Sequence, residues 1–245
     1  MCDYNQQFHN PFPSSATPFV TAVIVAAGNS TRMGGVNKQF LLIDGVPVLI
    51  RTLLAFSRSP LIQEIVVAAR EQDIEHIYDY LKQYRVEKVA AVVPGGETRQ
   101  KSVYAAIRSS SPFAEYFAIH DGARPLVTQE IIENTVKKAF ACRAAATGVR
   151  VKDTIKVVDS ENRITDTPDR STLWAVHTPQ VFERRLYLSA VDSVENSSQF
   201  TDDCKLTEAA GAPVYMVEGS YENLKITTPE DISFAEAVLK GRAKQ

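Results

Sequence analysis

Largely apolar runs alternate with amphipathic segments from about residue 20 to residue 140. Four runs are typical of strands buried on both faces of a sheet, namely TAVIVAA (21–27), Ile65–Ala69, KVAAVV (88–93) and YFAIH (116–120). Between and after them, apolar side chains recur at helical spacing, within Val46–Phe56, Ile74–Leu81, Val103–Ile107 and Ile131–Phe140. This alternation predicts an α/β fold with a mainly parallel central sheet flanked by helices. Right-handed crossovers then place the loops that follow the strands along one edge, where such sheets bind ligands.

The pattern changes in the segment that follows. TIKVVD (154–159) and RITDTPDR (163–170) alternate polar and apolar residues around a turn-prone SEN, which predicts a β-hairpin. Because this hairpin breaks the strand–helix rhythm, we expect it to project from the sheet as an arm at about residues 152–170. The strand-like apolar face of the arm comprises Ile155, Val157 and Ile164. An apolar face of this kind is stable when it is buried against another surface, which we expect to be a second chain. The alternative is that the arm folds over its own domain.

The rest of the chain is consistent with one domain. We expect a helix near Glu183–Val194, another that begins at a Thr201 cap, and a final helix capped by Thr228. VYMVEG (214–219) and LKIT (224–227) predict short strands. Residues 1–18 contain three prolines and no periodicity, which is typical of a disordered extension. The predicted organisation is therefore an extension at 1–18 and a single domain at 19–245.

Composition excludes several classes of protein. Lys and Arg number 27 against 29 Asp and Glu, and the net charge of −2 supplies no broad positive field. We therefore expect neither nucleic acid nor a membrane as a partner. No apolar run approaches 18 residues and no cationic segment precedes an apolar one near the start, which predicts a cytoplasmic protein. The cysteines and histidines lack the spacing of a zinc site.

The loop after the first apolar run combines glycines with cations. In AAGNSTRMGG (26–35) the glycines allow backbone N–H groups to point inward, and Arg32 and Lys38 add positive charge. This combination predicts a polyphosphate site; the alternative is a tight surface turn with solvated charges. The loop is neither a dinucleotide fingerprint, because Ser30 occupies a required glycine position, nor a P-loop, because Val36 stands where lysine is needed.

A second loop, HDGARP (120–125), ends the YFAIH run. An aspartate at the carboxyl end of a parallel strand lies where ligands lie, so Asp121 is a candidate to hold a hydroxyl or Mg²⁺, with Arg124 nearby for an anion. The alternative is an Asp-Gly turn whose Arg124 pairs with a surface carboxylate. We expect His120 to be a structural residue rather than a base.

A third loop, PGGETRQKS (94–102), combines glycines with the start of a helix. Ser102 and the amides of Gly95 and Gly96 are neutral hydrogen-bond partners, which suit the edge of a nucleobase better than a phosphate. Because three such loops fall on one predicted sheet edge, we expect them to form a single pocket.

Several motifs together resemble a known family. In chain order they are AAGNSTRMGG-x-x-K, GGETRQKSV, HDGARP, VKDT, DR-x-x-LW-x-x-HTPQ, FTDD and ENLKITTPED. From Val20 to Leu239 the chain resembles the 2-C-methyl-D-erythritol 4-phosphate cytidylyltransferases of the non-mevalonate isoprenoid pathway. The resemblance implies a Rossmann-like nucleotidyltransferase fold and transfer of CMP from CTP to the polyol phosphate, with release of pyrophosphate. Ribitol 5-phosphate cytidylyltransferase remains an alternative, as does a non-catalytic nucleotide-binding module.

The resemblance also implies roles for individual residues. Those that would frame the cytidine are Ala26, Ala27, Gly28, Gly95, Gly96 and Ser102. Arg32 and Lys38 would bind the triphosphate and Lys225 would lie beside the reacting phosphate, so these three are the candidate catalytic residues. Residues expected on the polyol side are Asp121, Arg124 and Thr201, with Thr154 and Arg170 reaching from the arm into a partner subunit's site. A homodimer follows, and Mg²⁺ is expected as the cofactor, with Asp121 as its candidate protein ligand.

Overall fold

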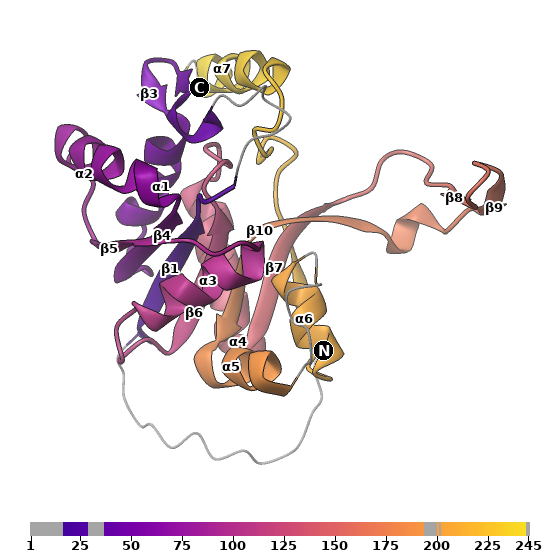
Figure 1. Ribbon diagram of the computed structural model, residues 1–245. Helices are drawn as coiled ribbons and strands as arrows, with labels where there is room; N and C mark the ends of the chain where they lie inside the picture. Colours follow the sequence, from indigo (N-terminus) through magenta and orange to yellow (C-terminus); the bar gives the residue numbers. More distant parts are fainter. Residues whose placement is uncertain (1–16, 29–36, 194–199, 201, 244–245) are drawn as a thin grey trace.

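The structure, a computed structural model, describes residues 17–28, 37–193, 200 and 202–243 (Figure 1). Except for residues 17 and 18, the predicted extension lies outside these ranges. Within them, no helix combines the length and the apolar character that crossing a membrane requires.

Seven strands form one central sheet, which confirms the predicted α/β architecture (Figure 1). They are β1 (Val20–Val25), β4 (Glu64–Ala69), β5 (Val89–Pro94), β6 (Tyr116–Asp121), β7 (Ala144–Arg150), β10 (Trp174–Glu183) and β11 (Tyr215–Glu218). Their order across the sheet is β11-β7-β10-β6-β1-β4-β5. Among these seven, only β10 runs antiparallel to its neighbours β6 and β7, so the sheet is mainly parallel. Side chains of β1 are almost wholly buried, as expected for a central strand covered on both faces.

Helices cover both faces of the sheet. One apolar cluster includes α1 (Val48–Arg58), α2 (Ile74–Gln83) and α4 (Gln129–Cys142). The other includes α3 (Arg99–Arg108), α5 (Arg184–Ser193) and α6 (Asp203–Ala209). The Thr128 hydroxyl caps α4 by accepting a hydrogen bond from the Ile131 amide at 3.3 Å.

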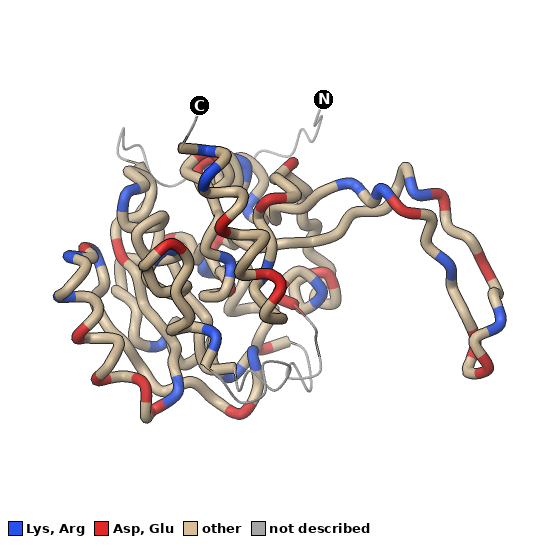
Figure 2. The backbone as a smooth tube through the Cα atoms, turned by 90° about the horizontal axis from the view of Figure 1, so that it is seen from above, with Lys and Arg blue, Asp and Glu red and all other residues tan. Residues whose placement is uncertain are grey.

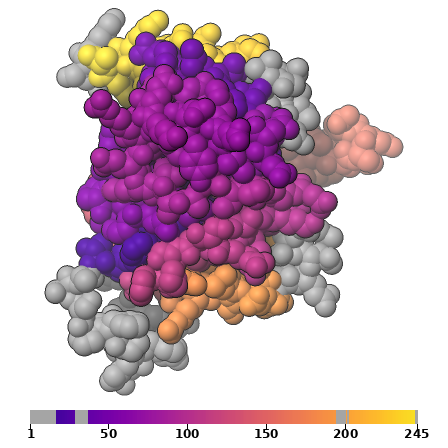
Figure 3. Space-filling view, turned by 60° about the vertical axis from the view of Figure 1, so that its left-hand side comes forward, coloured from indigo at the N-terminus to yellow at the C-terminus, as the bar shows by residue number. Residues whose placement is uncertain are grey.

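A third apolar cluster joins the end of the chain to the loops at one sheet edge. The final helix α7 (Glu230–Arg242) packs against a small hairpin formed by β2 (Leu42–Ile43) and β3 (Val46–Pro47), as the yellow and indigo surfaces at the top of Figure 3 show. Ala123 and Ile226 are buried in the same cluster. The helix therefore supports the loop after β6 and the segment that carries Lys225.

Three local predictions for the C-terminal part are wrong. Asp202, and not Thr201, caps α6, because its carboxylate accepts from the Lys205 amide at 2.8 Å. Pro229, and not Thr228, holds the cap position of α7, without a side-chain hydrogen bond. The Thr228 amide donates to the Asp231 carboxylate at 2.8 Å.

The segment LKIT (224–227) is not a strand. Its Ile226 amide bonds to the Ala123 carbonyl at 2.8 Å, so the segment packs against the loop after β6 and does not pair with a strand of the sheet.

The predicted arm stands away from the body of the molecule (Figure 1). It leaves from β7, returns into β10, and carries a short antiparallel hairpin of β8 (Val157–Val158) and β9 (Ile164–Asp166). Apolar side chains along it are exposed by 39% at Ile155, 45% at Val157, 47% at Val158 and 58% at Ile164. The alternative, in which the arm folds over its own domain, is therefore wrong.

Candidate active site

A cleft of about 300 Å³ opens where β1, β5 and β6 end. It is lined by Val25, Ala27, Gly28, Lys38, Gln39, Gly96, Glu97, Thr98, Arg99, Ser102, Asp121, Ala123 and Lys225. All three predicted loops contribute to it, which confirms that they share one edge and one pocket. Parallel strands produce this convergence because their carboxyl ends point the same way.

The neutral wall of the cleft is the loop after β5. The Ser102 hydroxyl accepts from the Gly96 amide at 3.1 Å and lies 3.0 Å from the Thr98 carbonyl, so it closes the loop onto the first turn of α3. A side chain at Gly95 would collide with Ala27 and come within 2.9 Å of the Ser102 hydroxyl. Glycine at this position therefore keeps the wall flat and lets two loops approach each other.

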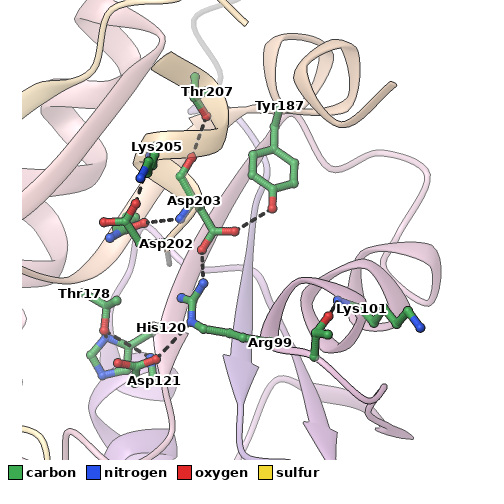
Figure 4. Close-up of polar contacts among 12 residues, drawn as sticks. Arg99, Lys101, His120, Asp121, Thr178, Tyr187, Asp202, Asp203, Lys205 and Thr207 are labelled. Atoms are coloured by element: carbon green, nitrogen blue, oxygen red, sulfur yellow. Dashed lines mark hydrogen bonds and ion pairs between the residues drawn. The ribbon is translucent and has the colours of Figure 1, made fainter. Parts of the chain in front are cut away.

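The charged wall is centred on Asp121, whose carboxylate faces three cations (Figure 4 shows part of this cluster). Oδ1 accepts from Arg99 Nε at 3.5 Å, while Oδ2 lies 3.4 Å from Arg124 Nε and 3.0 Å from Lys225 Nζ. Burial acts to raise the pKa of Asp121, but Lys225, Arg99 and Arg124 outweigh burial and hold the pKa well below its ordinary value. Asp121 is therefore ionised at neutral pH.

Thr178 and His120 hold the backbone of Asp121 in place. Thr178 of β10 accepts from the Asp121 amide at 3.1 Å and contacts His120 Nδ1 at 3.0 Å. His120 is fully buried, and burial lowers its pKa to about 3, so the ring is neutral at physiological pH. This agrees with the prediction that His120 is structural.

The segment that carries Lys225 is tied to the same loop. Arg124 Nη1 donates to the Asn223 carbonyl at 2.8 Å, and the side-chain amide of Asn223 donates to the Thr178 carbonyl at 3.0 Å. Lys225 is thereby placed at the cleft next to Asp121. Lys38 also lines the cleft, from a short 3₁₀ turn that Asn37 caps.

Comparison with known proteins identifies the family. A family model described as 2-C-methyl-D-erythritol 4-phosphate cytidylyltransferase matches residues 20–241. The chain belongs to this family. Relatives that bear the same name include one from Caldanaerobacter subterraneus subsp. tengcongensis, 49% identical over 90% of this chain and 99% of the relative. Another, from Desulforamulus reducens, is 46% identical over 91% of this chain and 97% of the relative.

Solved structures of the cytidylyltransferase family agree with the fold. The 4-diphosphocytidyl-2C-methyl-D-erythritol synthase from Anaerococcus prevotii is 32% identical, covers 91% of this chain and 97% of its own, and has a TM-score of 0.82. The 2-C-methyl-D-erythritol 4-phosphate cytidylyltransferase from Thermus thermophilus is 28% identical, covers 91% and 99%, and has a TM-score of 0.71.

The structure brings together most of the residues predicted for the cytidylyltransferase site. Ala27, Gly28, Lys38, Gly96, Ser102, Asp121 and Lys225 all line the cleft. Ala26, Gly95 and Arg124 lie directly behind this lining; Ala26 is buried, and the Gly95 amide bonds to the Ala69 carbonyl at 2.7 Å. Arg124 pairs with the largely buried Asp121 and not with a surface carboxylate, so the alternative of a simple exposed turn is wrong.

The four other predicted residues fall into two groups. Arg32 and Thr201 lie outside the described residues. Thr154 and Arg170 are exposed on the arm, where Arg170 Nη1 donates to the Lys152 carbonyl at 2.9 Å.

Gln39 and Arg99 are two of the cleft residues that sequence reasoning missed. Gln39 lines it with a buried side-chain oxygen that has no partner among the described residues. Arg99 joins Asp121 to Asp203 of α6. A signal for Arg99 was present, because a cation in the first turn of a helix opposes the helix dipole and implies a specific partner.

A larger hollow of about 590 Å³ lies elsewhere, between α4, α7 and the loop after β11. It includes Glu130, Glu218 and Glu222, and its cation Arg242 is already paired with Glu222 at 2.9 Å. None of the predicted site residues lines it, so its size alone does not make it the reaction site.

Proposed function

We propose that the chain transfers CMP from CTP to 2-C-methyl-D-erythritol 4-phosphate, giving 4-diphosphocytidyl-2-C-methyl-D-erythritol and pyrophosphate. The observation that carries this proposal is the cleft itself: Lys38, Lys225 and Asp121 face one cavity whose other wall is a neutral glycine loop. A triphosphate needs the cations and a cytosine needs the neutral hydrogen-bonding groups. Membership of the cytidylyltransferase family supports the same substrates.

The proposed step is a substitution at phosphorus. A phosphate oxygen of the polyol phosphate attacks the α-phosphorus of CTP, the bond from that phosphorus to the bridging oxygen breaks, and pyrophosphate leaves with the electron pair. Because two anions must approach each other, catalysis depends on orientation and on neutralisation of charge. No covalent intermediate with the protein is required.

Lys225 and Lys38 supply that neutralisation from this chain, with Arg32 as a third cation. Asp121 holds the Lys225 ammonium at 3.0 Å, which orients the cation towards the cleft and lowers its freedom. The segment at Ala26–Gly28 and the loop with Gly96 and Ser102 frame the nucleotide, and Asp121, Arg124 and Thr201 serve the polyol end. The Gly95 and Gly96 amides, which the sequence suggested as partners for the base, already donate to the Ala69 carbonyl at 2.7 Å and to the Ser102 hydroxyl at 3.1 Å, so this loop contributes its surface and not those two amides.

Magnesium fits this cleft best as part of the substrate. The described residues contain no cluster of three or more side chains suited to ligate a metal ion, and the Asp121 carboxylate already faces three cations. Mg²⁺ commonly uses phosphate oxygens, water and one or two carboxylates. We therefore infer that Mg²⁺ enters with the triphosphate, and that Asp121 is its nearest protein carboxylate.

The arm supports a homodimer with shared sites. Its exposed apolar residues need a cover, and Thr154 and Arg170 on it could then contribute a hydroxyl and a guanidinium to the partner's substrate phosphate. Mixing an Arg170→Ala chain with a Lys38→Ala chain tests this, since some mixed dimers regain one intact site. No recovery despite demonstrated subunit exchange would contradict sharing.

The reaction is tested by measuring the pyrophosphate released from CTP in the presence of Mg²⁺ with either 2-C-methyl-D-erythritol 4-phosphate or ribitol 5-phosphate. We expect turnover with 2-C-methyl-D-erythritol 4-phosphate, little with ribitol 5-phosphate, and none after removal of Mg²⁺ with EDTA. Turnover with ribitol 5-phosphate alone would overturn the substrate, and an unchanged rate in EDTA would overturn the role of the metal. Because the reaction consumes CTP, we place the enzyme in the cytoplasm, which cell fractionation tests.

A further inference from the structure

We propose that Arg99 is a positioning residue for cytidylyl transfer, acting through Asp121 and Asp203. The proposal rests on the proposed function, because it concerns how the cleft keeps its shape for that reaction. Nothing in the comparisons assigns a task to this arginine.

Arg99 joins three parts of the fold that are far apart in the sequence (Figure 4). It is the first residue of α3, directly after the glycine loop. Its Nε atom donates to Asp121 at the end of β6 at 3.5 Å, and its Nη1 atom donates to Asp203 of α6 at 2.5 Å. One side chain therefore links the nucleotide loop, the charged wall and α6.

Asp203 gives this link a fixed end. Its side chain is fully buried, and its second oxygen accepts from the Tyr187 hydroxyl at 2.6 Å. Its backbone amide donates to the Gln180 side chain of β10 at 3.2 Å. Because residues of α5, α6 and β10 fix the position of Asp203, the Arg99 guanidinium bonds to a rigid, buried partner.

The charge of Arg99 is balanced within the protein. Burial acts to lower its pKa, but Asp203 and Asp121 raise the pKa above its ordinary value, so the guanidinium stays charged. A guanidinium held between two carboxylates has its charge compensated. Direct binding of the triphosphate by Arg99 would have to break one of these ion pairs.

The consequence for the reaction passes through Asp121. Arg99 holds Oδ1, and this leaves Oδ2 directed at Lys225, 3.0 Å away. Arg124 also contacts Oδ2, at 3.4 Å, so without Arg99 no other side chain of the described residues holds Oδ1. The carboxylate can then turn about its Oδ2 contacts, and the Lys225 ammonium moves with it. The placement of the cation, rather than the affinity for CTP, is then what changes.

The test compares Arg99→Lys with a matched control. Lysine keeps the positive charge but lacks the planar fork that reaches two carboxylates. Arg184→Lys is the control, because Arg184 Nη1 also donates to several groups, the carbonyls of Ser111, Pro112 and Ala114, but does not line the cleft. Each variant is assayed with CTP, Mg²⁺ and 2-C-methyl-D-erythritol 4-phosphate, and its thermal unfolding is followed in parallel.

We expect Arg99→Lys to lower kcat at least about tenfold while KM for CTP changes less than about threefold, and Arg184→Lys to leave kcat unchanged. Tyr187→Phe, which removes the hydrogen bond to Asp203, should lower kcat about threefold. If Arg99→Lys does not fold, Tyr187→Phe is the decisive variant, and the proposal then requires that its kcat fall about threefold without a matching rise in KM for CTP.

Three results would overturn the proposal: wild-type kcat in the decisive variant, a raised KM for CTP at unchanged kcat, or an equal loss of kcat in Arg184→Lys. These results differ from failure of the proposed function, in which the wild-type protein itself shows no transfer with this substrate pair and the Arg99 proposal is overturned with it.

Discussion

The cleft and the arm distribute polar and apolar side chains in opposite ways. In the cleft and directly behind it, the ionisable side chains of Asp121, Arg124 and Asp203 are buried. On the arm, apolar side chains from Ile155 to Ile164 are exposed. Both arrangements are unfavourable unless the groups find partners, because burial penalises unpaired charge and water penalises contiguous apolar surface.

The two regions differ in where those partners come from. The buried charges of the cleft pair with one another within the chain, through Arg99, Arg124 and Lys225. The apolar residues of the arm have no comparable cover in the described part of the chain. The comparison teaches that the cleft is assembled by folding of one chain, whereas the arm would be completed by the association that we propose. The predictions below test each half of this contrast.

The largest effect is expected for Lys225→Met. Loss of a cation beside the reacting phosphate should lower kcat/KM at least about 100-fold, or about 2.7 kcal/mol of transition-state stabilisation. Folding should persist, because Asp121 keeps Arg99 and Arg124. Steady-state kinetics measure the loss, with Lys137→Met as control, since Lys137 forms an exposed pair with Glu133 on α4. A loss of less than threefold would remove Lys225 from catalysis.

The buried His120 beside the cleft should make the free energy of unfolding depend on pH. His120 has a pKa of about 3 in the folded protein and about 6.5 when unfolded, so the unfolded chain takes up the proton first as pH falls. The associated stability is present above about pH 6.5 and is lost as pH falls towards 3. At pH 5 the loss is about 2 kcal/mol.

Urea unfolding at pH 7.5 and pH 5 measures that loss, and His120→Gln should reduce it. His177, whose pKa burial lowers to about 4, adds a loss of its own that this variant leaves in place. An identical pH dependence in wild type and His120→Gln would contradict the assignment.

A charged substitution on the arm should weaken the proposed dimer without changing the stability of a protomer. Ile164→Asp should leave the unfolding free energy of a protomer within about 0.5 kcal/mol, because the side chain is 58% exposed. The dimer dissociation constant should rise at least about tenfold, because an apolar contact of about 1.4 kcal/mol is lost. Analytical ultracentrifugation measures both species, with Ser160→Asp in the turn as control. A wild-type protein that stays monomeric at all concentrations would refute the contrast.

The smallest effect is expected for Gly122→Ala in the loop after β6. An added Cβ atom would come within 3.1 Å of Leu49 Cδ1 and 3.2 Å of Ala26 Cβ, which is tight. Alanine also restricts the unfolded chain, which stabilises by about 0.4–1 kcal/mol. Since these effects oppose each other, thermal unfolding should shift by less than about 1 kcal/mol. A larger loss of stability would indicate that Leu49 and Ala26 cannot move to make room for the added atom.

Local sequence patterns predict the edge of the sheet where the site lies. Apolar runs locate β1, β4, β5 and β6, and glycine-containing loops after three of them locate the cleft. These features are predictable because strand burial and backbone freedom are properties of neighbouring residues.

Long-range features could not be predicted in the same way. Arg99 and Asp203 are separated by 104 positions, and no local pattern identifies them as partners. The alanine-rich β7 gives a weak strand signal, although it forms the ladder from which the arm departs. At the start of α7, Pro229 and not Thr228 holds the cap position, and the Thr228 amide donates to the Asp231 carboxylate.

The interleaved charges of the arm have a consequence for the newly synthesised chain. Lys and Arg alternate with Asp and Glu along the arm, as Figure 2 shows, and its two paired segments are very short. A long apolar strand left exposed would recruit strands from other molecules and aggregate. Charges of both signs, together with Pro168, disfavour such unregistered pairing. In the proposed dimer, these features would protect the arm of a newly made chain from unregistered pairing until a second subunit covers it.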